Sequence, residues 1–371
     1  MYIKSLKLIN FRNYIEQNIS FCNKINYIYG NNAQGKTNIL EAIYISSVGK
    51  SHRYAKDLEL VCFGAQNYFI ELDLVRNNRN YKIEIGFNNK KGKKIKVGGI
   101  ELKKIGELLG KLVVVIFSPD DLKLVKDSPA YRRRFLDILI CQLHVSYLFN
   151  LQQYIKILEQ RNNLLKQVKF KPELESTIDV WDEKLEQVGS KIIKKRIEFI
   201  LKIAENVRII HSKITSYKEN LEVIYKCNII DENCGSMSYE EIRDKFTKAL
   251  KKNKDIDFKR GFTSVGPHRD DFKLLINELD VEKYGSQGQQ RTVVLSLKLA
   301  EIEILKEEIQ ESPVLLLDDV FSELDENRRN FLKAYIKDIQ VFITSTDKLW
   351  ENSKNTNIKV IKVTNGNIYE E

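Results

Sequence analysis

An eight-residue stretch near the start of the chain carries the residue types that bind a polyphosphate. Residues 30–37 read GNNAQGKT and match the pattern G-x-x-x-x-G-K-[ST]. The stretch follows the apolar run INYIY and opens the helical run TNILEAIYIS, so it lies in a strand–loop–helix context. We expect the loop to hold a triphosphate, with Lys36 at the β- and γ-phosphates and Thr37 on Mg²⁺. The predicted contacts are Gly30, Asn31, Asn32, Ala33, Gln34, Gly35, Lys36, Thr37 and Asn38.

A second stretch, VLLLDDVFSELD at residues 314–325, ends an apolar run with two acids. In a parallel sheet the carboxyl ends of the strands face the ligand crevice. Asp318 is therefore predicted to hold Mg²⁺ through water, and Asp319 to act as the base or to orient the attacking water. With Lys36, Asp319 forms the predicted catalytic pair. Alone, this stretch is also compatible with an acidic turn that ends a strand.

A third stretch, YGSQGQQR at residues 284–291, precedes a long apolar helical run. Ser286 with Gln289 three residues later fits a capping box, and a helix N-terminus favours anions. If the first loop already encloses a triphosphate, this helix has no second phosphate in its own chain. One interpretation is that Ser286 and Gly288 bind the γ-phosphate of another copy, so that ATP holds a dimer together. The alternative is an ordinary capped helix.

The elements that must position these residues fall into two halves separated in the sequence. The first half has strand-like alternation, including a meander over about 68–99, and the second combines helices, buried strands and a hairpin at Asn365–Gly366. Between them, proline and glycine nearly vanish and long periodic segments indicate helices. We predict a mixed α/β (α+β) fold: a head formed by residues 1–120 and 256–371, and a mostly helical insert of residues 121–255.

Composition narrows the class of protein. The net charge is +10 with a pI of about 9.1, which suits an acidic partner such as nucleic acid, although composition bias explains it equally well. The five cysteines are odd in number and form no CxxC, so neither a disulfide framework nor a zinc site is indicated. The N-terminus alternates like a strand, and no apolar run has membrane length. We expect a cytoplasmic protein without a membrane partner.

Taken in order, these stretches resemble the ABC-type P-loop ATPase heads. The particular version resembles the RecF family of bacterial recombinational-repair proteins, which is SMC-like. The residues that carry the resemblance are KLINFRNY from 7, GNNAQGKTN from 30, FSPDDLKLVKDSPAYRRRFLD from 117, GPHRDD from 266, GSQGQQR from 285 and LLLDDVFSELD from 315. They spread over most of the chain and occur in the expected order.

The resemblance implies a protein that binds ATP with Mg²⁺, forms an ATP-dependent homodimer and binds DNA, both duplex and gap junctions, without sequence preference. It implies slow ATP hydrolysis used as a switch, stimulated by DNA, and action with RecO and RecR to help load RecA at gaps. By the same carry-over, Lys36, Thr37, Asp318 and Asp319 serve the nucleotide, with Thr37 and Asp318 on the metal. Ser286, Gly288 and Gln289 serve the partner's nucleotide, and Arg12 lies near the phosphates or the base.

Two positions depart from the general ABC pattern. No histidine follows the strand VFIT, where Ser345, Thr346 and Asp347 stand, and no glutamine follows VVVIFSP, where Asp120 and Asp121 stand. Both departures fit weak hydrolysis.

Three basic stretches remain open to two interpretations each. Arg132–Arg134 opens a helix and is either a DNA contact or a salt-bridged face, because a helix spreads three consecutive residues around its circumference. The hairpin tip at 89–96 is either a phosphate-contacting finger or a solubilising turn, and the stretch KSHR at 50–53 could reach DNA or a partner. The motif GPHRDD offers His268 as a weak metal ligand, and a structural role fits it better.

Other functions make distinguishable demands on the sequence. Another SMC-like head needs long coiled-coil arms, and a transporter subunit needs a switch histidine and a membrane partner. A monomeric P-loop kinase or transferase leaves Ser286 without a role, and a structural DNA-binding protein does not need an intact Lys36 and Asp318.

Overall fold

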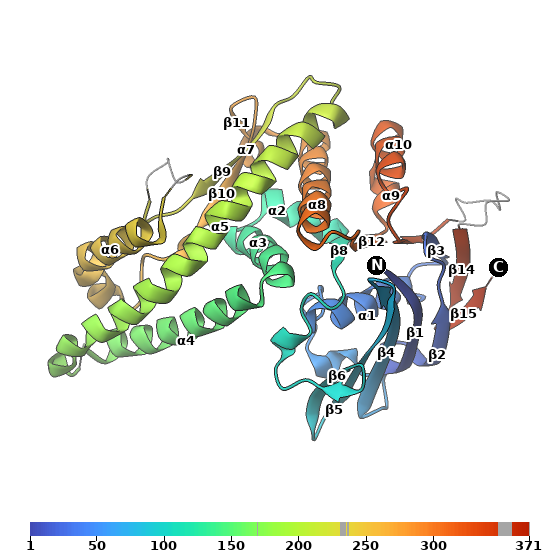
Figure 1. Ribbon diagram of the computed structural model, residues 1–371, viewed down its shortest axis with the longest axis horizontal. Helices are drawn as coiled ribbons and strands as arrows, with labels where there is room; N and C mark the ends of the chain where they lie inside the picture. Colours follow the sequence, from blue (N-terminus) through green and yellow to red (C-terminus); the bar gives the residue numbers. More distant parts are fainter. Residues whose placement is uncertain (169, 231–234, 236, 348–357, 371) are drawn as a thin grey trace. The chain divides into compact units, whose positions relative to one another are not determined.

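The computed structural model of the protein describes residues 1–168, 170–230, 235, 237–347 and 358–370. It divides into two compact units (Figure 1). Unit 1 comprises residues 1–121 and 301–371, and unit 2 comprises residues 122–300. The predicted head resumed at residue 256, whereas the compact unit resumes at 301. The difference arises because residues 256–300 pack with the helical segment.

Unit 1 contains an antiparallel sheet with the strand order β2-β1-β4-β5-β6-β7. Asn77 and Asn78 both adopt positive φ (48° and 57°), the backbone that a two-residue hairpin turn requires, and they join β4 to β5. The alternation expected over 68–99 is confirmed as this meander. The strands are β1 (Tyr2–Phe11), β2 (Tyr14–Ser20), β4 (Asn67–Arg76), β5 (Arg79–Asn88), β6 (Gly92–Val97) and β7 (Ile100–Glu101).

A second sheet of unit 1, of order β15-β14-β3-β13-β12-β8, is parallel apart from β15. Strands β8, β12 and β13 are buried along their whole length, as continuous apolar runs in a parallel sheet are. The hairpin expected at Asn365–Gly366 joins β14 to β15. The strands are β3 (Ile25–Tyr29), β8 (Val114–Phe117), β12 (Val314–Asp318), β13 (Val341–Ser345), β14 (Ile358–Thr364) and β15 (Asn367–Glu370).

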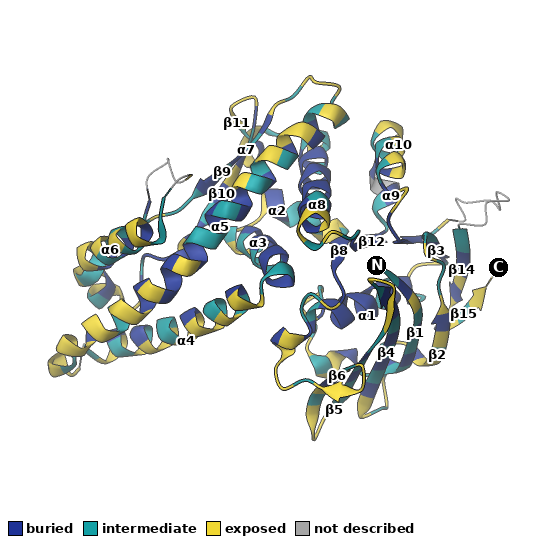
Figure 2. Ribbon diagram, in the orientation of Figure 1, coloured by how far each residue is buried: buried dark blue, intermediate teal, exposed yellow. Residues whose placement is uncertain are grey.

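Helix α1 (Lys36–Val48) lies between the two sheets, with contacts to β4 and β5 on one side and to β8, β12 and β13 on the other. Its residues 39–47 are all buried, so the helix that follows the phosphate loop forms the centre of the core (Figure 2). The other helices of this unit are η1 (Asp57–Leu60), η2 (Ile105–Glu107), η3 (Pro119–Leu122, whose last residue falls in unit 2), α9 (Val320–Glu323) and α10 (Glu326–Tyr335).

Unit 2 packs helices against a small sheet of order β11-β10-β9. The 37-residue α5 contacts α3, α4, α6 and β9, which makes it the central element. The helices expected in the insert are confirmed, and the same segment also contributes the strand β9. The elements are α2 (Lys123–Lys126), α3 (Pro129–Leu143), α4 (Val145–Val168), η4 (Pro172–Thr177), α5 (Ile178–Ile214), β9 (Leu221–Lys226), α6 (Tyr239–Arg260), η5 (Pro267–Arg269), β10 (Asp271–Ile276), β11 (Leu279–Asp280), α7 (Val281–Tyr284) and α8 (Gln287–Ile309), which continues into unit 1.

The motif GPHRDD holds this unit together through buried polar contacts. Arg196 of α5, which is 2% exposed, donates to the Pro267 carbonyl and forms an ion pair with Asp137 at 2.9 Å. Tyr154 hydrogen-bonds to His268 Nδ1 at 2.7 Å, and Tyr225 donates to Asp270. The structural interpretation of this motif therefore holds. No group of three His, Cys, Asp or Glu residues that could hold a metal occurs in the described part of the chain.

The arginine run on α3 is part of the same packing. Arg132 donates to both carboxylate oxygens of Asp271, at 2.7 and 3.0 Å, and Arg133 donates to the Asp270 carbonyl at 2.8 Å. Two of the three arginines therefore belong to a paired, partly buried interface within unit 2. The salt-bridged interpretation of this run is the one that the geometry supports.

Cys22, Cys62, Cys141 and Cys227 form no disulfide, and Cys234 lies outside the described residues. Among the described helices, none combines the length and the apolar character needed to cross a bilayer.

Candidate functional site

The phosphate loop follows β3 and requires glycine at two positions. Gly30 has φ 153°, and a Cβ there would lie 2.2 Å from the Val363 carbonyl oxygen. Gly35 has φ 115°, and a Cβ there would lie within 2.8 Å of Asn13 and of the Tyr14 hydroxyl. Because a side chain fits at neither place, the bare backbone forms a cradle that the first turn of α1 closes. That turn has no acidic residue and no side-chain cap, so its end favours an anion.

The loop is held from outside by the turn between β1 and β2. Asn13 Nδ2 donates to the Gln34 carbonyl at 2.7 Å, and Asn13 Oδ1 accepts from Asn38 at 2.8 Å. The Tyr14 hydroxyl donates to the Gly35 carbonyl at 3.0 Å. The sequence reasoning assigned no role to Asn13 or Tyr14, although both lie in the stretch FRNY. They fix the shape of the cradle before any ligand enters.

Lys36 is buried, with 7% of its surface exposed. Its Nζ donates to the carbonyls of Gly30 and Asn31 at 2.7 and 2.9 Å, which places the ammonium inside the loop. Burial lowers the pKa of Lys36, while the nearby charges of Asp319 and Asp318 oppose that shift. The arrangement supplies a positive charge, desolvated in part, where phosphate oxygens would lie.

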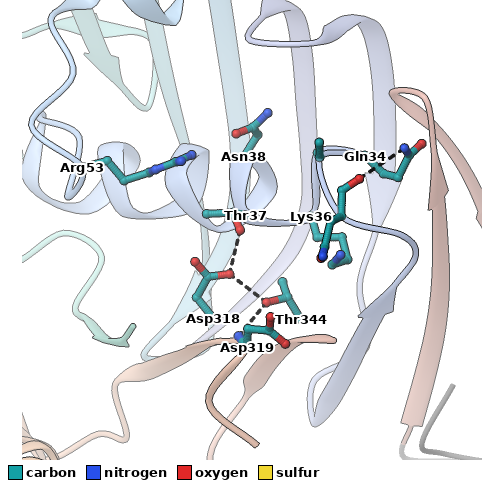
Figure 3. A pocket seen from close by; sticks show the side chains of 11 residues that line it. Gln34, Lys36, Thr37, Asn38, Arg53, Asp318, Asp319 and Thr344 are labelled. Atoms are coloured by element: carbon teal, nitrogen blue, oxygen red, sulfur yellow. Dashed lines mark hydrogen bonds between the residues drawn. The ribbon is translucent and has the colours of Figure 1, made fainter. Parts of the chain in front are cut away.

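The acidic pair is positioned by a short chain of hydroxyl groups (Figure 3). Asp318 Oδ1 accepts from Thr37 Oγ1 and from Thr344 Oγ1, each at 2.8 Å. The Asp319 backbone N–H donates to the same Thr344 hydroxyl at 3.0 Å, and Asp319 adopts φ 56°. Burial raises the pKa of the Asp319 carboxyl, Lys36 opposes this shift, and Asp318 adds to it.

These side chains line a cavity of about 200 Å³. Of the predicted residues, seven of the loop and both acids line it, while Gly30 and Asn31 contribute through their carbonyls to Lys36. Arg53 and Thr344 also line the cavity and were not assigned to it from sequence. The lining residues are Asn32, Ala33, Gln34, Gly35, Lys36, Thr37, Asn38, Arg53, Asp318, Asp319 and Thr344.

Arg12 is held by a buried carboxylate instead of lining this cavity. Its guanidinium donates twice to Glu41 of α1, at 2.9 and 2.8 Å, and once to the Glu59 carbonyl at 3.0 Å. Burial raises the pKa of Glu41, but hydrogen bonds from Arg12 and Ser51 outweigh it, so the pKa lies below its ordinary value. Ser51 in turn accepts from the Arg53 backbone N–H at 3.0 Å, which links Arg12 to the segment that carries Arg53.

The third predicted stretch lies at the start of α8, within unit 2. The Ser286 N–H donates to Gln289 Oε1 at 2.9 Å, and the Gln289 N–H donates to Ser286 Oγ at 3.2 Å. This reciprocal pair is the predicted capping box, and we refer to residues 286–289 as the Ser286 cap. Its residues lie in a different compact unit from the phosphate loop.

The donor set of the cavity fits Mg²⁺. The ion prefers oxygen ligands and keeps several waters, so one carboxylate, one hydroxyl and phosphate oxygens suffice to hold it. Thr37 and Asp318 meet at 2.8 Å and would supply that hydroxyl and that carboxylate.

The chain is similar over its whole length to known proteins. A family model described as the RecF/RecN/SMC N terminal domain matches residues 2–369. The DNA replication and repair protein RecF of Acetivibrio thermocellus is 47% identical over 370 residues, covering 100% of both chains. The protein of the same description from Clostridium tetani is 46% identical over 372 residues, again covering 100% of both.

Solved structures agree. The recombination mediator protein RecF with ATP, in the RecFOR pathway, has a TM-score of 0.93 at 40% identity, covering 100% of this chain and 97% of the other. An SMC head domain from Pyrococcus furiosus has a TM-score of 0.56 at 16% identity, covering 100% and 96%, which shows the fold alone. The predicted mixed α/β fold of an ATPase head is confirmed.

Proposed function

The chain belongs to the RecF/RecN/SMC family and within it to the RecF proteins, and on this premise we propose that it is an ATP-dependent DNA-binding protein of DNA replication and repair. It dimerises on DNA when it binds ATP, hydrolyses the nucleotide slowly, and acts with RecO and RecR at gaps to help load RecA. The observation that carries the proposal is the pairing of Thr37 with Asp318 beside a glycine cradle that encloses Lys36.

In this proposal the loop and the first turn of α1 bind the phosphates of ATP. Lys36 exchanges its two loop carbonyls for β- and γ-phosphate oxygens, which are better partners for an ammonium. Thr37 and Asp318 hold Mg²⁺, which when bound neutralises phosphate charge. Arg53, which lines the same cavity, adds a second cation.

Hydrolysis combines ATP with water to give ADP and phosphate, and in this proposal Asp319 receives the proton of the attacking water. Its raised pKa makes it a better base than an exposed carboxylate. Its backbone is held by Thr344, so the side chain projects from a fixed point. The position of the absent switch histidine carries Ser345, Thr346 and Asp347, which supports slow turnover.

The Ser286 cap completes the site of a second copy. Ser286, Gly288 and Gln289 contact the γ-phosphate of the partner's ATP, so the nucleotide stabilises the dimer only while its γ-phosphate is intact. A helix N-terminus with a serine hydroxyl suits that anion. This role is supported by the capping geometry, which orders these residues before they meet a ligand.

DNA is bound through its phosphate backbone, without reading the sequence. The net charge of +10 supports this, and Lys90 and Lys91 are exposed at the tip of the β5–β6 hairpin. Lys93 of the same hairpin is not available, because it forms an ion pair with Asp57 at 2.6 Å. Affinity that falls steeply with salt concentration supports backbone binding, and a flat dependence contradicts it.

The test is sedimentation velocity with Mg²⁺-ATP, with and without duplex DNA. Wild type is compared with Ser286→Arg, which blocks the cap, and with Lys36→Ala, which removes nucleotide binding. We expect ATP-dependent dimers for wild type only, and ATP binding by both wild type and Ser286→Arg. If wild type binds ATP and stays monomeric at high concentration, the dimer proposal is wrong and a monomeric P-loop transferase becomes the better assignment.

A further inference from the structure

A partly buried group of side chains contacts the Ser286 cap and has no part in the function proposed so far. Gln289 Nε2 donates to Glu219 Oε1 at 2.9 Å, and Glu219 Oε2 lies 3.1 Å from His211 Nε2. The other ring nitrogen of His211 lies 3.0 Å from Ser296 Oγ. The contacts therefore run from the cap, through a carboxylate and an imidazole, back to Ser296 in the third turn of α8.

From these contacts we infer that Glu219 is a positioning residue, which holds the Ser286 cap in the form that binds the partner's γ-phosphate. The inference rests on the proposed function, and it adds a residue from the loop between α5 and β9 to that composite site.

The chemistry of the Gln289 amide explains why an acceptor is needed behind it. The amide must present its oxygen to the Ser286 N–H, because a flipped amide would bring two donors together. Glu219 accepts from the opposite end of the same amide, and a carboxylate accepts but does not donate. Only one orientation satisfies both contacts, so Glu219 selects the orientation that closes the cap.

Glu219 is itself held rigidly, as a positioning residue must be. Its side chain is 22% exposed, and that of its partner His211 is 0% exposed. The loop that carries it is fixed on both sides: the Tyr217 N–H donates to the Ser212 carbonyl at 2.6 Å, and Asn220 exchanges two hydrogen bonds with Asn277, at 2.9 and 3.0 Å. The carboxylate thus sits on a backbone with little freedom to follow Gln289 if that side chain moved.

The first experiment tests whether the cap is held, by measuring the hydrogen-exchange rate of the Ser286 amide in the intact protein without nucleotide. Glu219→Ala removes the acceptor, and we expect exchange to become about tenfold faster, because the Gln289 amide no longer holds its hydrogen bond. Glu219→Gln keeps an acceptor oxygen and should restore slow exchange. Glu222→Ala is the matched control, since its carboxylate accepts from Asn220 instead. Glu219→Met, which keeps the side-chain length, replaces Glu219→Ala if that variant unfolds.

The second experiment reads function, by ATP-dependent dimerisation of the same variants. We expect Glu219→Ala to raise the dimer dissociation constant about tenfold while the monomer binds a fluorescent ATP analogue as wild type does. Glu219→Gln and Glu222→Ala should dimerise like wild type. Rescue by the conservative variant separates positioning from a general loss of structure.

Three results overturn the inference. Unchanged exchange in Glu219→Ala means that the acceptor does not hold the cap. Faster exchange with unchanged dimerisation means that the cap need not be held. If wild type and every variant alike bind ATP without dimerising, the proposed function itself fails and takes the positioning role with it. That result is distinguishable because it does not depend on residue 219.

Discussion

Thr344→Val is the substitution that tests the geometry of the acidic pair most directly. The Thr344 hydroxyl donates to Asp318 Oδ1 and accepts from the Asp319 N–H, and the residue is 1% exposed. Valine has nearly the same shape but can neither donate nor accept a hydrogen bond. The change therefore loosens the predicted metal ligand and the predicted base together, while the glycine loop of residues 30–37 keeps its own contacts.

The magnitude follows from the two contacts. A hydrogen bond to a charged acceptor contributes about 1.5 to 3 kcal/mol, and an unsatisfied buried N–H costs about 1 to 3 kcal/mol. Since some of this is recovered by local movement, we take about 2 kcal/mol as the loss in positioning the reacting groups. That corresponds to an approximately 30-fold slower turnover.

The assay is phosphate release from Mg²⁺-ATP in the presence of DNA, with ATP affinity and thermal unfolding measured alongside. Thr344→Ser is the matched control, because it keeps the hydroxyl, and it should turn over ATP within about threefold of wild type. A valine variant as fast as wild type would refute the reasoning. So would a serine variant as slow as the valine one, because the hydroxyl would then not be the cause.

Three further predictions concern the cradle and the core of unit 2. Gly35→Ala should lower ATP affinity at least about tenfold in a fluorescence titration, because the added Cβ would lie 2.6 Å from the Asn13 side chain. Gly64→Ala, where no atom lies within 4 Å of the added Cβ, should leave ATP affinity unchanged. Arg161→Ala should lower the free energy of unfolding in urea by about 3 to 5 kcal/mol, since it leaves the buried Asp257 unpaired; Arg208→Ala, at an exposed site, should change it by about 0.5 kcal/mol or less. Burial lowers the pKa of His268 from 6.5 to about 4. The unfolded chain therefore binds a proton at this residue at a higher pH than the folded protein does. The free energy of unfolding should have its full value above pH 6.5 and decrease as the pH falls to 4. His268→Gln should make the urea midpoint of unfolding depend less on pH over that interval. A variant whose pH dependence equals that of wild type would contradict this role for His268.

The residues of the candidate phosphate site could be predicted where they lie in one contiguous stretch of the sequence. A strand, a glycine loop and a helix start are contiguous, and so is an apolar strand that ends in two acids. Lys36, Thr37 and Asp318, which these patterns single out, line one cavity in the structure. Thr344 was missed because it reaches the site through pairing, as the register partner of Asp318 on the neighbouring strand. A single sequence does not reveal which strands are neighbours or how they are aligned.

The second boundary of the head illustrates the same limit. The mixed pattern resumes at residue 256, yet residues 256–300 pack with the helical unit, because β10 pairs with β9 and Arg132 reaches Asp271. A change in periodicity indicates a change of secondary structure, but it does not indicate which other helices and strands the new elements pack against. The same limit applies to a single side chain, Arg12. Its partner Glu41 is a buried acid on an apolar helix, and nothing in the sequence indicates that the two residues pair.

The position of β3 in its sheet has a consequence for how the protein is made. Its two neighbours are β13 and β14, which begin at residues 341 and 358. A ribosome that has finished β3 must add about 300 more residues, which takes roughly 15 to 60 seconds, before either neighbour exists. During that time the chain contains every residue of the phosphate loop but exposes both edges of the strand that carries it, and exposed edges invite pairing with other chains. A message cut short before β13 would therefore yield a polypeptide with the complete loop sequence but with neither of the strands that pair with β3.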